Sequence, residues 1–315
     1  MTTSNLVLID CDEETAGLRL DVFLAGAIED ASRSFIKKLI KDGKVRINDL
    51  TCTRPGRTLN AGESVAVDLP PPATTELKPE DIPLEILHED ADVLVVNKPS
   101  GLVVHPAPGH PNGTLVNAVL FHCKDFQQPG EDALRPGIVH RLDQYTSGVM
   151  VVGKSPRGFA SLAEQSREHT FDRRYLAIVR GEFKDNAGRI TASIGRSTHD
   201  RHRMTVTGLN SRDAVTRFEV LERFGVASLV SLVLETGRTH QIRVQASSRG
   251  HAVLGDTMYG ARAPFGPPVD EERQQRIALL ARELVFFHPS TREETRLVAP
   301  LDEAWDGLGL DLAAS

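Results

Sequence analysis

The chain has 315 residues and a formal net charge of −6 at pH 7, and 40% of its residues are hydrophobic. This length and composition indicate a globular protein of about two domains. No apolar run approaches the roughly 20 residues of a membrane helix, and the opening MTTSN lacks the basic start of a secretory signal. We therefore expect a cytoplasmic protein without a membrane span.

Cofactor chemistry is not indicated by the sequence. The three cysteines, Cys11, Cys52 and Cys123, are scattered and lack the spacing of metal ligands, so we expect reduced thiols and no metal site. The sequence also lacks a glycine-rich phosphate loop, so ATP or NAD binding is not expected.

Composition divides the chain into four segments. Residues 1–15 are predicted to form an extended arm, and residues 16–70 a small domain. Residues 71–83 are rich in Pro, Thr, Glu and Lys and show no periodicity, which is typical of a linker. Residues 84–315 are then expected to form a second, larger domain.

The small domain is predicted to contain two helices followed by short strands. Apolar side chains recur at helical spacing in residues 20–28. A second helix is expected between Ser32, a typical N-cap, and Gly43, a typical stop. Residues 45–47 and 64–69 alternate polar and apolar side chains as strands do.

Basic residues gather in the second half of this domain, although the chain as a whole is acidic. They form either an ordinary solvated face or a phosphate-binding face. Residues 18–69 resemble the alpha-L (S4-like) RNA-binding module, and this resemblance favours the second interpretation. The candidate RNA-binding residues are Arg33, Lys37, Lys38, Lys41, Lys44 and Arg46.

The larger domain shows many strand-like runs with interspersed helices and no strict alternation of the two. This pattern predicts an α+β fold with a mixed, largely antiparallel sheet flanked by helices. Helices are predicted at residues 114–123 and 159–168, strands at 84–87, 93–96, 171–181, 215–220, 228–234 and 296–298, and either a helix or a strand at 279–288.

The stretch 140–148, HRLDQYTSG, directly precedes the apolar run 149–152. It either mounts the carboxylate of Asp143 at the edge of a sheet, or forms a turn in which Asp143 accepts hydrogen bonds from Thr146 and Ser147. These residues alone leave both interpretations open.

Two further stretches have loop character. Residues 97–106 contain Pro and Gly and are predicted to form a surface loop that carries Lys98 and His105. Residues 196–203 are dense in Arg and His and are either a flexible loop or an RNA contact.

Several short motifs follow one another in a characteristic order. They are KPSG at 98–101 with VVHP at 103–106, HRLDQYTSG at 140–148, RYLA at 174–177, TGRTHQIR at 236–243, GDTMYG at 255–260 and FHP at 287–289. Together they resemble the RluA-type RNA pseudouridine synthases over nearly the whole chain. With the fused N-terminal module, the chain is most similar to the members that act on the large ribosomal subunit.

The resemblance implies an enzyme that isomerises specific uridines to pseudouridine in large-subunit (23S) ribosomal RNA. In that reaction the N1–C1′ glycosidic bond of uridine breaks, the uracil turns, and C5 is joined to C1′. Because the product is an isomer of the substrate, the resemblance implies no cofactor. Ribosomal RNA is the expected partner, and we expect a monomer.

The resemblance also implies roles for single residues. Asp143 attacks the ribose at C1′ or removes a ribose proton, and Arg243 is the cation paired with it. Tyr175 lies against the target uracil and assists removal of the C5 proton. Arg141 fills the space that the flipped base leaves, and Lys98 contacts RNA.

The chain departs from the family's usual residues at Arg174, Gln245, Ala252 and Leu280. Two other functions also fit parts of the sequence. A non-catalytic RNA-binding or ribosome-assembly factor would use the same basic residues. A glycoside hydrolase would also act at an anomeric carbon, but it usually needs a second carboxylate, and none accompanies Asp143 in its motif.

Overall fold

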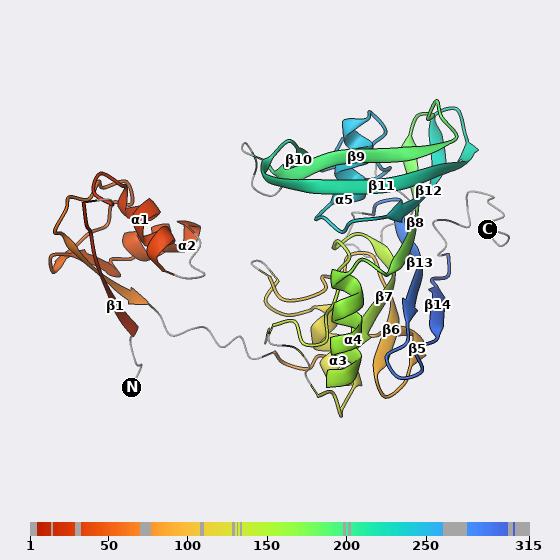
Figure 1. The fold of residues 1–315 in the computed structure, drawn as a ribbon, viewed down its shortest axis with the longest axis horizontal. Coiled ribbons are helices and arrows are strands. Elements are labelled where there is room, and N and C mark those ends of the chain that lie inside the picture. Colours follow the sequence, from red (N-terminus) through yellow and green to blue (C-terminus); the bar gives the residue numbers. More distant parts are fainter. Residues whose placement is uncertain are drawn as a thin grey trace. The chain divides into compact units, whose positions relative to one another are not determined.

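The computed structural model (Figure 1) describes residues 5–13, 15–28, 33–69, 77–107, 110–127, 130, 132, 134–197, 200, 203–260, 276–301 and 305. The chain divides into two compact units, Met1–Glu76 and Leu77–Ser315. The division falls inside the predicted linker, and Ile82 near the end of that linker packs against the core of the larger unit. Within the described ranges, no helix is both long and apolar enough to cross a membrane.

The smaller unit packs two helices on a four-stranded antiparallel sheet of order β1-β4-β2-β3. Its elements are β1 Asn5–Asp10, α1 Leu20–Ala27, α2 Arg33–Lys41, β2 Val45–Ile47, β3 Leu50–Thr51 and β4 Ser64–Leu69. The helices bury apolar side chains such as Leu24 and Ile40 in a core shared with the sheet. Part of the predicted arm is therefore an edge strand, because β1 pairs with β4 along its whole length.

The predicted stop of α2 at Gly43 lies two residues past the last residue of the helix, Lys41. Gly43, with φ +72°, follows the helix and takes the left-handed conformation that glycine adopts without steric cost. The predicted N-cap, Ser32, lies outside the described residues.

The larger unit contains a ten-stranded sheet of order β10-β9-β11-β12-β8-β13-β7-β6-β5, with β14 paired to β13. Every pair is antiparallel except β13 with β7, which is parallel. The predicted α+β fold with a mixed, largely antiparallel sheet is confirmed, and the ambiguous stretch 279–288 forms strand β13. The strands are β5 Glu85–Glu89, β6 Val93–Lys98, β7 Ser147–Gly153, β8 Asp172–Arg180, β9 Ala187–Arg196, β10 Met204–Val206, β11 Leu209–Arg223, β12 Ala227–Leu234, β13 Leu279–Phe287 and β14 Glu294–Val298.

In the described part of this unit, three helices cover the sheet: α3 Leu115–His122, α4 Pro156–Arg167 and α5 Gln241–Ser248. The strands β6 and β7 are continuous apolar runs because they are buried along most of their length, and α4 packs along β7 (Figure 1). α4 begins after Ser155, whose Oγ accepts the Gly158 N–H at 2.9 Å. Gln165 then exchanges two hydrogen bonds of 2.8 Å with the backbone of Phe287 on β13, which fixes the end of the helix.

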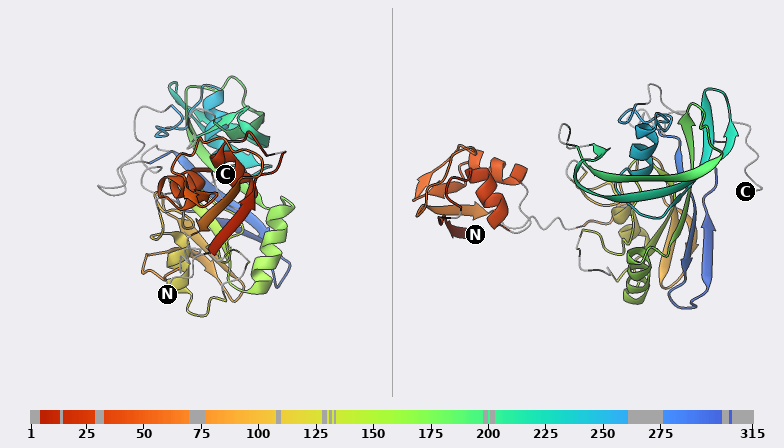
Figure 2. Two further views of the ribbon diagram at one scale, coloured as in Figure 1. Left: turned by 90° about the vertical axis from the view of Figure 1, so that its left-hand side faces the viewer. Right: turned by 45° about the horizontal axis from the view of Figure 1, so that its top comes forward.

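α5 packs along β9 and β10, and the long ribbon of β9 and β11 bends around it (Figure 2). Its position is fixed by two buried glutamines one turn apart. Gln241 donates to Thr216 Oγ1 at 2.9 Å, and Gln245 accepts from the same hydroxyl at 2.6 Å. Gln245 also donates to the carbonyls of Ile190 and Ala214 at 3.2 and 3.0 Å. The departure from the usual residue at position 245 therefore serves to lock α5 to the sheet.

Candidate active site

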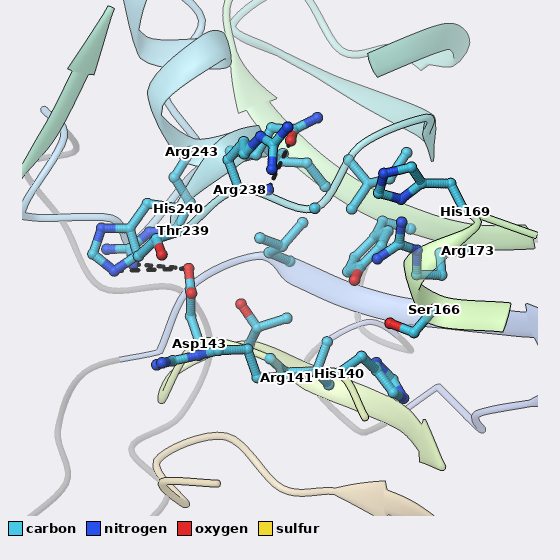
Figure 3. A pocket seen from close by; sticks show the side chains of 18 of the residues that line it. His140, Arg141, Asp143, Ser166, His169, Arg173, Arg238, Thr239, His240 and Arg243 are labelled. Atoms are coloured by element: carbon cyan, nitrogen blue, oxygen red, sulfur yellow. Dashed lines mark hydrogen bonds and ion pairs between the residues drawn. The ribbon is translucent and has the colours of Figure 1, made fainter. Parts of the chain in front are cut away.

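A pocket of about 220 Å³ opens where β7 begins (Figure 3). Three segments that lie far apart in the sequence form most of its lining: the loop before β7, the end of α4 with the start of β8, and residues 237–243 at the start of α5. Leu234 and Leu279 complete it. The pocket brings together the predicted residues Asp143, Tyr175, Arg243 and Arg141.

The sheet register explains part of this convergence. Gly148 of β7 is paired with Ala281 of β13, and Ala281 is paired with Tyr175 of β8. A single strand therefore separates Tyr175 from the end of the loop that carries Asp143.

Residues 98–101 hold the loop that carries Asp143 through hydrogen bonds to its backbone. The ammonium of Lys98 donates to the carbonyl of Gln144 at 3.1 Å, and the N–H of Gly101 donates to the same carbonyl at 2.8 Å. Ser100 Oγ donates to the carbonyl of Tyr145 at 2.9 Å. The backbone directly after Asp143 is thus fixed before any substrate binds.

The prediction that Lys98 and His105 lie on the surface is wrong. Burial disfavours the predicted RNA contact of Lys98, which stays a prediction. Lys98 is fully buried, and its ammonium also donates to the carbonyls of Pro99 and Leu102, both at 2.9 Å. Burial lowers the pKa of Lys98 to about 7, although the charge of Asp143 opposes the shift. Proline and glycine keep this loop out of the sheet, and the buried ammonium satisfies carbonyl groups that have no ladder partner.

Lys98→Met tests this anchoring role. Because the variant leaves buried carbonyl groups without a donor, we expect the free energy of unfolding to fall by about 1–3 kcal/mol. Turnover should fall as the Asp143 loop loosens, while RNA affinity stays unchanged. Urea unfolding and filter binding of RNA measure the two effects. Weaker RNA binding at unchanged stability would instead restore Lys98 as an RNA contact.

The carboxylate of Asp143 belongs to a buried charged triad. Arg243 donates from Nη1 to Asp143 Oδ2 at 3.1 Å, and from Nε and Nη2 to the two oxygens of Asp256 at 2.7 and 3.0 Å. Asp256 is fully buried, and the side chain of Asp143 is 15% exposed. Burial acts to lower the pKa of Arg243, but the two carboxylates raise it above its ordinary value. Arg243 therefore stays charged and directs Asp143 into the pocket.

The turn interpretation of residues 140–148 is only partly realised. The backbone N–H of Thr146 donates to the backbone carbonyl of Asp143 at 3.1 Å, which closes a turn. The carboxylate, however, accepts from Arg243, so the turn presents Asp143 to the pocket.

His240 also approaches Asp143. Its Nε2 lies 3.9 Å from Asp143 Oδ2, and its Nδ1 lies 2.8 Å from the hydroxyl of Tyr259. Tyr259 already accepts the N–H of Met204 at 2.9 Å, so its own proton is available to His240 Nδ1. Burial lowers the pKa of His240, which favours a neutral ring whose Nε2–H faces Asp143.

Tyr175 is buried on the pocket wall with 6% of its surface exposed. Burial raises its pKa to about 12, so the phenol carries its proton at neutral pH. Its neighbour Arg174, the departure next to this tyrosine, is exposed and does not line the pocket, whereas Arg173 does. Arg141 lines the pocket and is exposed to solvent.

His140 supports the site structurally. Its Nε2 accepts the N–H of Val151 at 3.1 Å, and its ring meets Phe171 edge to face. Burial, followed by the charge of Arg173, lowers the pKa of His140 to about 3. A neutral ring is required, because a protonated nitrogen cannot accept the Val151 N–H.

This pKa predicts a pH dependence of stability. Between the ordinary pKa of 6.5 and about 3, the unfolded chain binds a proton at His140 that the folded protein does not. Stability should therefore fall as the pH falls through this window, by at most about 1.4 kcal/mol per pH unit from this residue. His140→Gln, whose amide oxygen accepts the same N–H, should show a shallower fall. Urea unfolding at a series of pH values tests this, and equal slopes would contradict it.

The smaller unit carries the predicted basic face. Lys38, Lys41 and Lys44 are exposed, and Lys37 and Arg46 are partly exposed. Lys37 lies 3.6 Å from the buried carboxylate of Asp21, and Lys44 lies 3.2 Å from Asp68. The side chain of Arg33 lies outside the described part of the chain. RNA binding by this face stays a prediction.

Residues within reach of a shared metal ion occur outside the pocket. Among the described residues they form two groups, His88 with Asp90 and His288, and Glu89 with His122 and Cys123. Hydrogen bonds of 2.6 Å between His288 and Asp90, and of 2.8 Å between His122 and Glu89, already account for their proximity.

Three residues of the site were not predicted to act there: Asp256, His240 and Tyr259. All three lie in motifs that carry the family resemblance, at 236–243 and 255–260. The motifs were the available signal, but their order along the chain does not reveal which side chains meet. Of the polar loop 196–203, residues 198–199 and 201–202 lie outside the described residues.

Comparisons with known proteins find matches for both units of the chain. A family model described as RNA pseudouridylate synthase matches residues 92–248, and an S4 domain model matches residues 18–65. An uncharacterized RNA pseudouridine synthase of Bacillus subtilis (strain 168), YlyB, is 43% identical over 299 residues, which cover 95% of each chain. Ribosomal large subunit pseudouridine synthase D of Zymomonas mobilis is 41% identical over 294 residues, which cover 92% of each chain.

The fold is shared with solved structures. Human RNA pseudouridylate synthase domain containing 4 aligns with a TM-score of 0.55 at 27% identity, covering 72% of this chain and 94% of that one. The chain therefore belongs to the RNA pseudouridine synthases, which are isomerases, and it carries an N-terminal S4 domain.

Proposed function

We propose that the protein converts specific uridines of large-subunit (23S) ribosomal RNA to pseudouridine, with Asp143 acting at the ribose and without a cofactor. The observation that carries this proposal is the carboxylate of Asp143, held on the pocket wall by the buried cation Arg243. A relative named for the large ribosomal subunit supports the choice of RNA. We further infer that the protein acts in the cytoplasm as a monomer.

We propose a task for each oxygen of Asp143. Arg243 and His240 both approach Oδ2, at 3.1 and 3.9 Å, so we assign Oδ1 to the substrate. There it either attacks C1′ or takes a proton from the ribose. Both routes break the N1–C1′ bond and leave the uracil free to turn so that C5 bonds to C1′.

Tyr175 and Arg141 bind the flipped nucleotide in this proposal. Flipping a uridine costs on the order of a few kcal/mol, and stacking on an aromatic ring recovers about 1–3 kcal/mol. Tyr175 offers the ring on the pocket wall. Arg141, exposed beside Asp143, takes the place of the extruded base in the RNA.

The hydrolase alternative is disfavoured because the second carboxylate near the site, that of Asp256, cannot act as the acid. A glycosidase acid must reach the leaving oxygen. Asp256, however, is fully buried and both of its oxygens accept hydrogen bonds from Arg243. It is therefore the support of Arg243 and not a second acid.

The enzyme and the non-catalytic RNA-binding factor are separated by one comparison. Pseudouridines in the large-subunit RNA of a deletion strain are mapped by carbodiimide modification and primer extension, after complementation with wild type or Asp143→Ala. We expect sites that only the wild type restores. Equal restoration by both proteins would refute the assignment of Asp143.

The exposed lysines of the smaller unit should bind RNA phosphates without reading sequence. The triple variant Lys38→Gln, Lys41→Gln and Lys44→Gln should weaken RNA binding and flatten the plot of log affinity against log salt. Each lost phosphate contact should reduce the slope by roughly 0.7–1. Lys184→Gln, which removes an exposed lysine of the larger unit, is the control. An unaltered slope in the triple variant would count against an RNA-binding face.

A further inference from the structure

Arg173 is a pocket guanidinium that forms no ion pair with the described residues of the protein. Its Nε is buried yet has no hydrogen-bond partner among the described residues. The other pocket arginines on the α5 side do have partners: Arg243 binds two carboxylates, and Arg238 donates from Nε to the carbonyl of Asp213 at 3.0 Å. A buried donor without a partner is costly in a folded protein, which points to a ligand atom as its missing partner.

Strand alternation directs Arg173 into the pocket. On β8, Arg173 and Tyr175 share one face and both line the pocket, while Arg174 lies on the opposite face and is exposed. Figure 3 shows Arg173 across the pocket from Asp143. The charge of Arg173 reaches Tyr175, where it acts against the rise of the tyrosine pKa.

Gly237 makes room for this guanidinium. A Cβ at position 237 would lie 2.9 Å from Arg173 Nη1, closer than side chains pack. Because the obstructing atom is the end of a flexible side chain, an added methyl group would displace the guanidinium and leave its charge in the protein.

Resting on the proposed uridine isomerisation, we propose that Arg173 binds a carbonyl oxygen of the target uracil and stabilises the negative charge of the detached ring. When the N1–C1′ bond breaks, its electron pair stays on N1 and spreads over the carbonyl oxygens. Asp143 meanwhile either bonds to C1′ or accepts a ribose proton, so the uracil is anionic on both routes. C5 then bonds to C1′ as the Asp143–C1′ bond breaks or, on the second route, as Asp143 returns the proton to the ribose. The C5 proton leaves, and N1 regains a proton.

The charge balance of the site favours such a cation. Asp143 is neutral once it has bonded to C1′ or taken a ribose proton, and Asp256 then offsets the charge of Arg243, so this pair leaves the negative charge of the uracil uncompensated. Arg173 supplies a positive charge together with planar N–H donors, at a place where no reorganisation is needed.

The test compares purified wild type with Arg173→Gln, Arg173→Lys and Gly237→Ala, and uses Arg174→Gln as the neighbouring control. Single-turnover loss of the target nucleoside at saturating enzyme, read from digests of the RNA, is measured on transcripts that contain uridine or 5-fluorouridine at the target. We expect Arg173→Gln to lower the rate of uridine turnover by about a hundredfold, with RNA affinity and melting temperature unchanged. Arg173→Lys keeps the charge without the planar fork, so its rate should lie between those of wild type and Arg173→Gln. Gly237→Ala should resemble Arg173→Gln, and Arg174→Gln should resemble wild type.

The second substrate separates charge stabilisation from a structural role. Fluorine withdraws electrons from the ring, so cleavage of the N1–C1′ bond of 5-fluorouridine should depend less on Arg173, with a loss of about tenfold. Equal losses on both substrates, or uridine turnover by Arg173→Gln within about twofold of wild type, would overturn the inference. An inactive wild type would instead overturn the proposed function.

Discussion

Arg243→Met should lower the free energy of unfolding by about 3–5 kcal/mol and abolish uridine isomerisation. The variant leaves Asp256, which is fully buried, without the cation that binds both of its oxygens. It also releases Asp143 from the donor that directs it into the pocket. Urea unfolding followed by circular dichroism measures the first effect, and pseudouridine formation in a ribosomal RNA transcript measures the second.

A double variant separates the two effects. Arg243→Met with Asp256→Asn removes the uncompensated buried charge, so we expect much of the stability to return. Activity should not return, because Asp143 still lacks its partner. If Arg243→Met unfolded at the same urea concentration as wild type, the stabilising role of Arg243 in the triad would be contradicted.

Gly148→Ala should cost about 2–5 kcal/mol of stability and most of the activity. Gly148 has φ +116°, and a Cβ there would overlap the backbone of Ala281 on the parallel neighbour β13. Either β7 or β13 must shift, and β7 carries the Asp143 loop at its start. Urea unfolding and turnover at saturating RNA measure the two losses.

Gly225→Ala is the matched control for this change. Gly225 has φ +77° and open space around it. An alanine there therefore adds only the cost of a side chain at positive φ, which we expect to be about 1–2 kcal/mol. Similar losses of stability in the two variants would show that the close contact with Ala281 has no consequence.

Much of the fold could be predicted from pattern alone. The apolar runs of β6 and β7 and the helical spacing of α3 gave elements of the right type because burial there follows the period of the element. The stretch 279–288 stayed ambiguous because a strand buried on both faces lacks alternation. The pairing of residues 5–10 cannot be read from their own pattern, because their partner, β4, lies far along the chain.

The site could be predicted only through the family resemblance. It supplied Asp143, Tyr175 and Arg243, which the structure gathers in one pocket. The contact between Asp143 and Arg243 spans 100 residues of sequence, so no local pattern indicates it. Asp256 lies 13 residues from Arg243, and Tyr259 lies 19 residues from His240, and no local pattern indicates these contacts either.

For Lys98 the sequence predicts the wrong environment. A lysine in a loop with Pro and Gly is usually exposed, and here it is fully buried because three carbonyls accept its protons. The partners that reverse the expectation become visible only in the folded chain.

The most direct test of the central claim is release of tritium from a large-subunit ribosomal RNA transcript labelled at C5 of uridine. Forming the C5–C1′ bond expels the hydrogen from C5, so each pseudouridine releases one label to the solvent. Purified wild type should release tritium in a fixed ratio to RNA without any added cofactor, and Asp143→Asn should release none. Release by both proteins, or by neither, would contradict the account.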